Sequence, residues 1–296
     1  MGEQAAALGR PQTLWAGTGF YADAWRRLRR HRSAIVGLVI VGALASAAVF
    51  APVIAPADPI TQDLGARLLP PSQRHWLGTD DLGRDLLTRL VFGGRVSLTV
   101  GIVSVGIALA TGSLLGLLAG FYGGWAESLT MRMMDVMLAF PATLLAIFIV
   151  GIRGPGLNNA MLAIGVINIP IFARIVRGSV LRARQEDYVE AARALGASQP
   201  HIIHRHILPN SLAPIIVQAT LGVGSAVLEA AGLSFLGLGA QAPTPEWGAM
   251  LTNTREYLRD APWAATFPGI AILLTVVGCN LLGDGLRDAL DPRLRQ

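Results

Sequence analysis

Long stretches without charged residues dominate the chain. Six windows, each 17–31 residues long, contain no Asp, Glu, Lys or Arg: 33–57, 96–126, 136–152, 154–173, 206–228 and 261–283. A helix needs about 20 residues to cross the hydrocarbon layer of a membrane. Most of the windows lack the alternation of a barrel strand, so the expected spanning structure is helical. The pattern predicts an all-α, polytopic membrane protein with six transmembrane helices.

Composition agrees with a membrane protein and removes several enzyme classes. The chain is 52% hydrophobic and 15% charged, whereas soluble domains average about 25% charged residues. All 24 basic residues are Arg, so no Lys is present for a Walker A phosphate site or a Schiff base. The single cysteine, Cys279, excludes an internal disulfide and a cysteine-based metal cluster. The Arg residues flank the hydrophobic windows, so topology explains the net charge of +5 better than a nucleic-acid partner does.

The distribution of Arg predicts the orientation of the helices. With the first helix running from inside to outside, the inner segments hold 16 Arg and the outer segments 8, which places both termini in the cytoplasm. A cleavable signal peptide ending near Ala43-Leu44-Ala45 is the competing interpretation; the long leader and the spanning length of the apolar stretch favour an uncleaved helix. The plan is a cytoplasmic segment at 1–32, a first transmembrane helix at 33–57, an external connector at 58–95, a five-helix core at 96–283 and a cytoplasmic tail at 284–296.

Two outer segments are too long for simple turns. Prolines mark the first of them: Pro52, Pro56, Pro59, Pro70 and Pro71. They indicate an extended connector, after which residues 80–95 are expected to form a short helix leading into the second span. Residues 234–262 are expected to form an external loop with a short interfacial helix around Trp247. Loops of this length tend to carry function.

The second predicted span has a face of small residues. Gly112, Gly116 and Gly120 recur at four-residue spacing, which places them on one side of a helix. Such a face allows two membrane helices to approach closely. We therefore expect packing, not activity, from these glycines, and the same from Cys279.

The segment 185–210 predicts two helices joined by a tight turn. Residues 185–195 favour a helix, and Gly196 can end it in a left-handed cap. A second helix is expected to begin near Ser198, because Pro200 is tolerated in a first helical turn. Pro209 marks the beginning of the next span. The result is an elbow on the cytoplasmic side that presents a small rigid surface to another protein.

This segment resembles the cytoplasmic signature of the inner-membrane permease subunits of bacterial ABC importers. The matching residues are Glu190, Ala191, Ala192, Gly196, Leu208 and Pro209; His206 stands where the signature has Ile. Three further motifs are similar to those of the dipeptide/oligopeptide/nickel branch: His75-Trp76-Leu77-Gly78-Thr79-Asp80 with Gly83-Arg84-Asp85, Phe140-Pro141, and the run 233–239 after Glu229. The resemblance covers roughly residues 20–296.

The resemblance implies the transport complex to which the chain belongs. Such permeases pair with a homologous second permease, two ATPase subunits and an external solute-binding protein in the bacterial inner membrane. ATP and Mg²⁺ would be bound by the ATPase subunits, with no cofactor, no metal and no catalytic residue on this chain. The elbow residues expected to dock on an ATPase are Glu190, Ala191, Ala192, Gly196, Ala197, Leu208 and Pro209. The expected cargo is a di- or oligopeptide, with nickel or glutathione as alternatives.

Candidate residues follow for the substrate path and for the external face. Glu229 ends 23 uncharged residues, and a charge at such depth must face protein or water. A structural pair with a neighbouring Arg and a role in the substrate path both remain open; in the path, Glu229 would oppose a peptide amine. The other path candidates are Ser234 and Trp247. Candidates for contact with the binding protein are Trp76, Asp80, Asp81, Arg84 and Asp85.

Several groupings have plainer interpretations. His201, His204 and His206 are not expected to bind a metal, because His206 should point away from the face shared by the other two. Asp135 is expected to form an interfacial ion pair with Arg132. The acids in 58–85 lack the spacing of a calcium loop, so salt links or contacts with the binding protein are expected. The indole side chains of Trp76, Trp247 and Trp263 suit the membrane interface.

Two other functional classes fit the sequence less well. A secondary transporter usually has inverted repeats and paired charges inside its spans, whereas Glu229 is the single candidate here. A scaffold that transports nothing would leave the elbow without a purpose.

Overall fold

The computed structural model describes residues 26, 28, 29, 31–55 and 57–290, and the regular elements among these residues are helices. Most of the predicted cytoplasmic segment 1–32, and residues 291–296 of the predicted tail 284–296, lie outside the described residues. The helices are α2 (Arg32–Val49), α3 (Ala51–Ile54), η2 (Leu64–Ala66), α4 (Leu86–Tyr122), α5 (Gly124–Ala139), α6 (Ala142–Arg153), α7 (Leu157–Arg184), α8 (Asp187–Ala194), α9 (Gln199–Ile202), the π-helical η3 (Ile203–Ile207), α10 (Leu208–Phe235), α11 (Trp247–Thr254), η4 (Arg255–Tyr257) and α12 (Pro262–Leu290).

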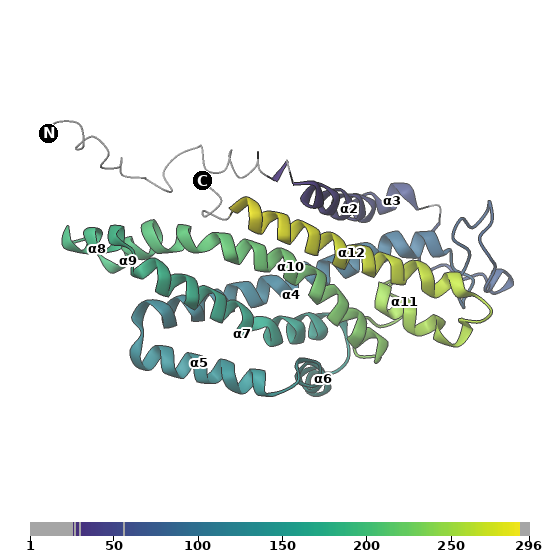
Figure 1. Cartoon of the computed structure of the whole chain (residues 1–296). Coiled ribbons are helices and arrows are strands. Elements are labelled where there is room, and N and C mark those ends of the chain that lie inside the picture. Colours follow the sequence, from purple (N-terminus) through teal and green to yellow (C-terminus); the bar gives the residue numbers. More distant parts are fainter. Residues whose placement is uncertain (1–25, 27, 30, 56, 291–296) are drawn as a thin grey trace.

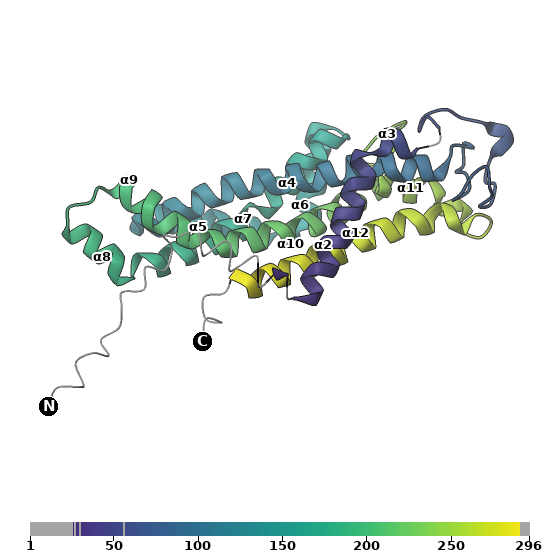
Figure 2. The same cartoon turned by 90° about the horizontal axis from the view of Figure 1, so that it is seen from above.

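Four long helices, α4, α7, α10 and α12, run side by side and make the body of the bundle (Figure 1). Helix α2 packs across α12 (Figure 2). Helices α8 and α9 lie at one end of the bundle, which we call the elbow end. Helix α11 and the loop 57–85 lie at the other, which we call the loop end. The elements that carry the candidate sites are thus separated by the length of the bundle.

Five helices among the described residues are long and apolar enough to cross a membrane, namely α2, α4, α7, α10 with the preceding residues 199–207, and α12. A sixth candidate is the pair α5 and α6, which is bent by 92°. The sequence predicted a continuous third span, but the helix breaks at Phe140-Pro141. Phe140 is extended, because the residue before a proline avoids the helical region and Pro141 has no N–H to continue the helix.

The contact between α4 and α7 confirms the predicted small-residue face. A Cβ atom on Gly112 would lie 2.7 Å from the Ile169 carbonyl oxygen, and one on Gly116 would lie 2.4 Å from that of Ala173. Only glycine permits the two backbones to approach so closely. Helix α7 is thereby fixed against the longest helix of the bundle.

The start of α4 differs from the prediction. Instead of a short separate helix over 80–95, the chain from 67 to 85 is irregular, and a single helix begins at Leu86 and runs to Tyr122. Asp85 caps it by accepting a hydrogen bond from the Thr88 N–H at 2.9 Å, which satisfies one of the free donors of the first turn. The last ten residues of the predicted connector therefore belong to a long helix.

Candidate functional site

The elbow has the predicted helix–turn–helix geometry, and a glycine sets its turn. The Gly196 N–H donates to the Arg193 carbonyl at 2.9 Å and the Ala197 N–H to the Ala192 carbonyl at 3.0 Å. These two bonds form a Schellman motif, which requires a left-handed residue after the helix. Gly196 has φ +78°, and a Cβ there would meet no atom within 4 Å. The requirement for glycine is therefore conformational and not steric.

Apolar side chains anchor the elbow to the spans. Val189 of α8, Ile202 of α9 and Ile207 of η3 are fully buried. They pack in one cluster with Val176 and Val180 of α7. Each buried side chain of this size contributes roughly 1.5–3 kcal/mol. The elbow is consequently a firm extension of α7 and α10.

The tip of the elbow is left uncovered. Leu195, the residue before Gly196, is 89% exposed, and Glu190 and Ala191 are exposed beside it. The Glu190 carboxylate has no hydrogen bond or ion pair with any described residue. Leu208 and Pro209 are half-buried where α10 begins. Leu195 was not among the predicted docking residues, although an apolar residue directly before a capping glycine was the available signal.

The histidines of the elbow lie differently from the prediction. The rings of His201 and His206 are 5.9 Å apart, and Tyr188 lies 6.0 Å from His206. The expectation that His206 points away is wrong, because the π-helical turn Ile203–Ile207 brings residues five apart into register. Within the described part of the chain, no three His, Cys, Asp or Glu side chains are placed to hold a metal ion.

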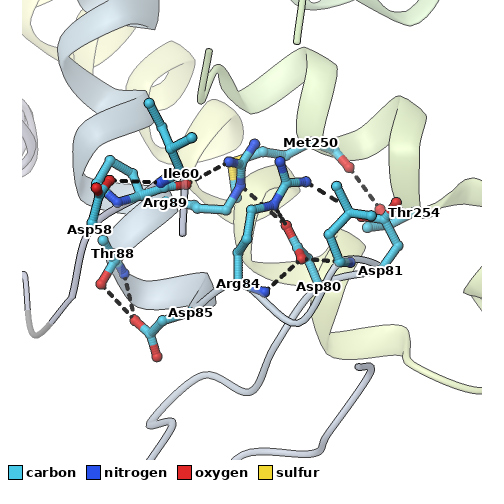
Figure 3. Close-up of polar contacts among 12 residues, drawn as sticks. Asp58, Ile60, Asp80, Asp81, Arg84, Asp85, Thr88, Arg89, Met250 and Thr254 are labelled. Carbon is cyan, nitrogen blue, oxygen red and sulfur yellow. Dashed lines mark hydrogen bonds and ion pairs between the residues drawn. The ribbon is translucent and has the colours of Figure 1, made fainter. Parts of the chain in front are cut away.

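At the loop end, a buried carboxylate organises two arginines (Figure 3). Asp80 accepts from Arg84 Nε at 2.7 Å and forms an ion pair with Arg89 Nε at 3.2 Å. Arg89 also donates to the Pro59 carbonyl at 2.8 Å, which ties the loop to α4. Burial, and next the charge of Asp80, raises the pKa of Asp81 above its ordinary value, while Arg84 opposes the shift. The acids in 58–85 were expected to form salt links or to contact the binding protein, and the salt links are present.

The expected contact with a binding protein needs correction for three residues. Asp80, Arg84 and Asp85 are buried, and their polar atoms are used within the loop. Asp85 accepts from the Thr88 hydroxyl at 2.8 Å and lies 3.1 Å from His75 Nδ1. These side chains shape the loop end and offer little surface to a partner. By contrast, Trp76 is 71% exposed.

Helix α11 is held by a carboxylate that the sequence analysis did not single out. Glu246 is 1% exposed and accepts from the N–H groups of Gly248 and Ala249, at 2.9 and 2.8 Å. The Ser97 hydroxyl of α4 donates to it at 3.2 Å. A helix N-terminus favours such an acceptor. An acid before Trp-Gly in a proline-rich loop was the one signal for this cap.

Trp247 is a core residue, which contradicts its assignment to the substrate path and to the membrane interface. Its side chain is 2% exposed, and the indole N–H donates to the Leu90 carbonyl at 2.9 Å. The ring lies against Gly93 and Gly94 of α4, so neither face is free for a ligand. Ser234 is likewise buried, and its hydroxyl accepts from the Ala240 N–H at 3.4 Å.

Glu229 lies partly exposed on α10, and its partner is an amide. Asn168 of α7 donates to the Glu229 carboxylate at 2.9 Å and to the Ile164 carbonyl at 2.9 Å. No described Arg pairs with Glu229, so the structural ion pair is absent among the described residues. The carboxylate therefore joins α7 to α10 and keeps part of its surface open.

The charged pairs between α5 and α7 also differ from the prediction. Asp135 pairs with Arg174 at 2.6 Å and not with Arg132, and Glu127 accepts from Arg177 Nε at 2.8 Å. The two arginines lie 39 and 50 residues away from their partners in sequence, so a search for pairs among sequence neighbours cannot find them. Both pairs connect the helix before the 92° bend to the helix that carries the elbow.

Known proteins share both the sequence and the arrangement of these elements. Residues 112–296 match the family model "Binding-protein-dependent transport system inner membrane component", and residues 19–71 match "N-terminal TM domain of oligopeptide transport permease C". A dipeptide transport system permease protein (DppC) of Alkalihalophilus pseudofirmus is 51% identical, over 96% of this chain and 94% of that protein. A glutathione transport system permease protein (GsiD) of Pectobacterium atrosepticum is 48% identical, over 93% and 92%.

A solved structure supports the fold. An inward-facing MetNI methionine ABC transporter matches with a TM-score of 0.55 and 19% identity, over 68% of this chain and 96% of that one. At this identity the likeness concerns the fold alone. The family models and the close relatives extend it to the kind of protein. The chain is a multi-pass inner-membrane protein and belongs to the family of binding-protein-dependent ABC importer permeases, in the dipeptide/oligopeptide branch.

Proposed function

We propose that this chain forms half of the membrane path of an ATP-driven importer of di- or oligopeptides. The observation that carries the proposal is the elbow: its tip exposes Leu195 and Glu190, which has no ion pair among the described residues, while its base is buried in the spans. The peptide cargo is supported by relatives named for dipeptide transport at 51% and 49% identity. Glutathione is the second candidate cargo, since a relative of 48% identity is named for it.

The proposed topology has six spans, with the elbow and both termini in the cytoplasm. Two contacts support it. His31, directly before α2, pairs with Asp288 near the end of α12 at 2.9 Å. A Cβ on Gly285 would lie 2.3 Å from that of Ala34. The start of α2 and the end of α12 thus meet on the side of the bundle that is nearer the elbow (Figures 1 and 2), in agreement with the excess of inner Arg.

The proposed partners are a homologous permease, two ATPase subunits that bind ATP and Mg²⁺, and an external solute-binding protein. One ATPase subunit would hold Leu195, Glu190 and the Gly196 turn in a groove. Because Val189 and Ile207 are buried against α7, a movement of the elbow moves α7 and α10 with it. Such coupling requires an element with two conformations, whose equilibrium is shifted both from the elbow end and from the loop end.

The test is reconstitution of the assembled transporter in liposomes. We expect dipeptide-loaded binding protein to stimulate ATP hydrolysis and to give uptake of labelled dipeptide. Stimulation by glutathione-loaded or nickel-loaded binding protein, without an effect of any dipeptide, would reassign the cargo and leave the machine intact. Uptake driven by an ion gradient in the absence of ATP would contradict the proposal as a whole.

A further inference from the structure

A cavity of about 590 Å³ lies between α7, α10 and α12, toward the elbow end. Three arginines line it, Arg174 and Arg182 from α7 and Arg287 from α12, together with Gln218 of α10. The remaining lining is mostly apolar and includes Ile175 and Val217. Its size falls within the range of small-molecule sites, roughly 300–1,000 Å³.

The cavity carries an excess of positive charge. Arg174 is compensated by Asp135 at 2.6 Å. Arg182 and Arg287 are exposed and have no ion pair with any described residue. Among the described residues neither guanidinium group has an acidic partner, and guanidinium binds a carboxylate through two parallel hydrogen bonds.

The same face of α7 and α10 carries the Glu229–Asn168 pair. Asn168, Ile175 and Arg182 follow at seven-residue spacing on α7, so they lie on one side of the helix. Gln218 and Glu229 are eleven residues apart on α10, which is close to three full turns. Partly exposed polar groups this deep in a span face water or protein and not lipid. We take this shared face of α7 and α10 as the face of the proposed path.

Along this face the charge changes sign. The Glu229 carboxylate contacts Asn168 of α7. Arg182 lies fourteen residues further along α7, which at 1.5 Å per residue is about 21 Å away. An extended dipeptide is roughly 7 Å long. It is therefore too short to contact Glu229 and Arg182 at the same time and would contact them one after the other. The arginines also stand where α7 and α12 end. The negative ends of both helix dipoles gather there and would otherwise repel an anion.

We propose that this cavity is a transient binding site for the carboxylate group of the transported peptide, held by Arg182 and Arg287 at the inner mouth of the path. The inference rests on the proposed function, because it takes the path face and the peptide cargo from it. The two arginines lower the barrier for a carboxylate to leave the spans, as rings of positive side chains do in anion pores.

The experiment compares wild type and variant forms of the assembled transporter in liposomes, with dipeptide-loaded binding protein outside and ATP inside. The first form is wild type. The second is the double variant Arg182→Gln/Arg287→Gln. The third is Arg132→Gln, which removes an exposed arginine that does not line the cavity. Initial dipeptide uptake and ATP hydrolysis are measured together at low and high salt.

We expect the double variant to import dipeptide about fivefold more slowly, with stimulated ATP hydrolysis within twofold of wild type. Rising salt should bring wild type toward the variant, because it screens the two charges. Arg182→Lys/Arg287→Lys should recover most of the uptake, and Arg132→Gln should behave as wild type.

Three results would overturn the inference. Normal uptake by the double variant would show that the arginines serve only the helix ends, while the proposed function would stand. Parallel loss of uptake and hydrolysis would assign the arginines to coupling. Normal uptake together with loss of bound anionic phospholipid, measured by native mass spectrometry, would make the cavity a headgroup site. Failure of wild type to import any peptide would instead remove the proposed function, and this inference with it.

Discussion

Two glycine turns of nearly identical geometry stand at opposite ends of this molecule. Gly196 ends α8 at the elbow and Gly237 ends α10 at the loop end, with φ values of +78° and +77°. At Gly237 the same pair of backbone bonds recurs, from Gly237 to Ser234 and from Leu238 to Leu233, each at 2.9 Å. A leucine precedes each glycine, and neither glycine has an atom within 4 Å of an added Cβ.

The surroundings of the two turns differ. The Gly237 carbonyl accepts from Gln241 Nε2 at 3.1 Å, and the Leu238 carbonyl accepts from the Gly156 N–H at 3.2 Å. The turn at Gly237 is thus tied to α7 and to its own loop. In the part of the chain that the structure describes, no hydrogen bond from another element reaches Leu195 or Gly196, and Leu195 is 89% exposed. The same local chemistry closes the fold at one end and leaves a surface for a partner at the other.

Removing one acid at each end gives the largest expected contrast. Asp80→Ala leaves Arg84 and Arg89 buried without their carboxylate and should lower the free energy of unfolding by about 3–5 kcal/mol. Glu190→Ala removes an exposed acid and should change it by less than about 0.5 kcal/mol. Unfolding in detergent measures both. Equal destabilisation by the two variants would contradict the distinction between the ends.

Glu246 tests how firmly the loop end is built. Glu246→Leu leaves two helix N–H groups and the Ser97 hydroxyl without an acceptor and should cost about 3 kcal/mol. Glu246→Gln keeps one acceptor oxygen of similar size and should cost about 1 kcal/mol. The same unfolding measurement applies. If the two variants were equally stable, the hydrogen bonds would not be what holds α11.

Much of the fold follows from the sequence because membrane helices and glycine caps are local signals. The uncharged windows predicted the long apolar helices, the Gly112–Gly116–Gly120 spacing predicted a face for close helix packing but not its partner α7, and Gly196 predicted the elbow turn. Each depends on residues within a few turns of one another. The break at Phe140-Pro141 was also visible as a local signal, but a hydrophobic window alone does not distinguish a straight span from a bent one.

The polar contacts that organise the candidate sites were harder to predict. Glu246 meets Ser97 across 149 residues, and Asp135 meets Arg174 across 39. Trp247 was assigned to the membrane interface from its residue type alone. Its burial depends on the packing of Gly93 and Gly94 against the ring, which the local sequence does not show. The His201–His206 approach depends on one π-helical turn, which no spacing rule for α-helices anticipates.

Replacing the leucine before each glycine, Leu195 or Leu236, tests whether only the elbow turn contacts a partner. Leu195→Asn should reduce the stimulation of ATP hydrolysis about tenfold, because an exposed apolar side chain at the centre of an interface contributes roughly 1–2 kcal/mol. Leu236, which is 58% exposed, has no such partner in our account, and Leu236→Asn should leave stimulation unchanged. Neither change should alter unfolding. A loss of stimulation in Leu236→Asn alone would place the coupling surface at the loop end and contradict its assignment to the elbow.

The smallest expected effect concerns Asp81. Its pKa is raised in the folded protein by burial and by Asp80, so the folded state binds this proton more tightly than the unfolded state does. Stability from this group is present at low pH and is lost as the pH rises through the folded pKa. Asp81→Asn should therefore be slightly more stable than wild type at pH 7, with the difference shrinking on acidification. A difference that grows at low pH would contradict the direction of the shift.

The most direct test of the account compares Gly196→Asp with Gly237→Asp in the reconstituted transporter. Both place a side chain at the same positive φ in open space, so both should cost about 1–2 kcal/mol of stability. ATP hydrolysis is measured with and without peptide-loaded binding protein. We expect that the Gly196→Asp transporter assembles but loses stimulation, while the Gly237→Asp transporter keeps it. Full stimulation in Gly196→Asp would show that the elbow does not couple this chain to its ATPase.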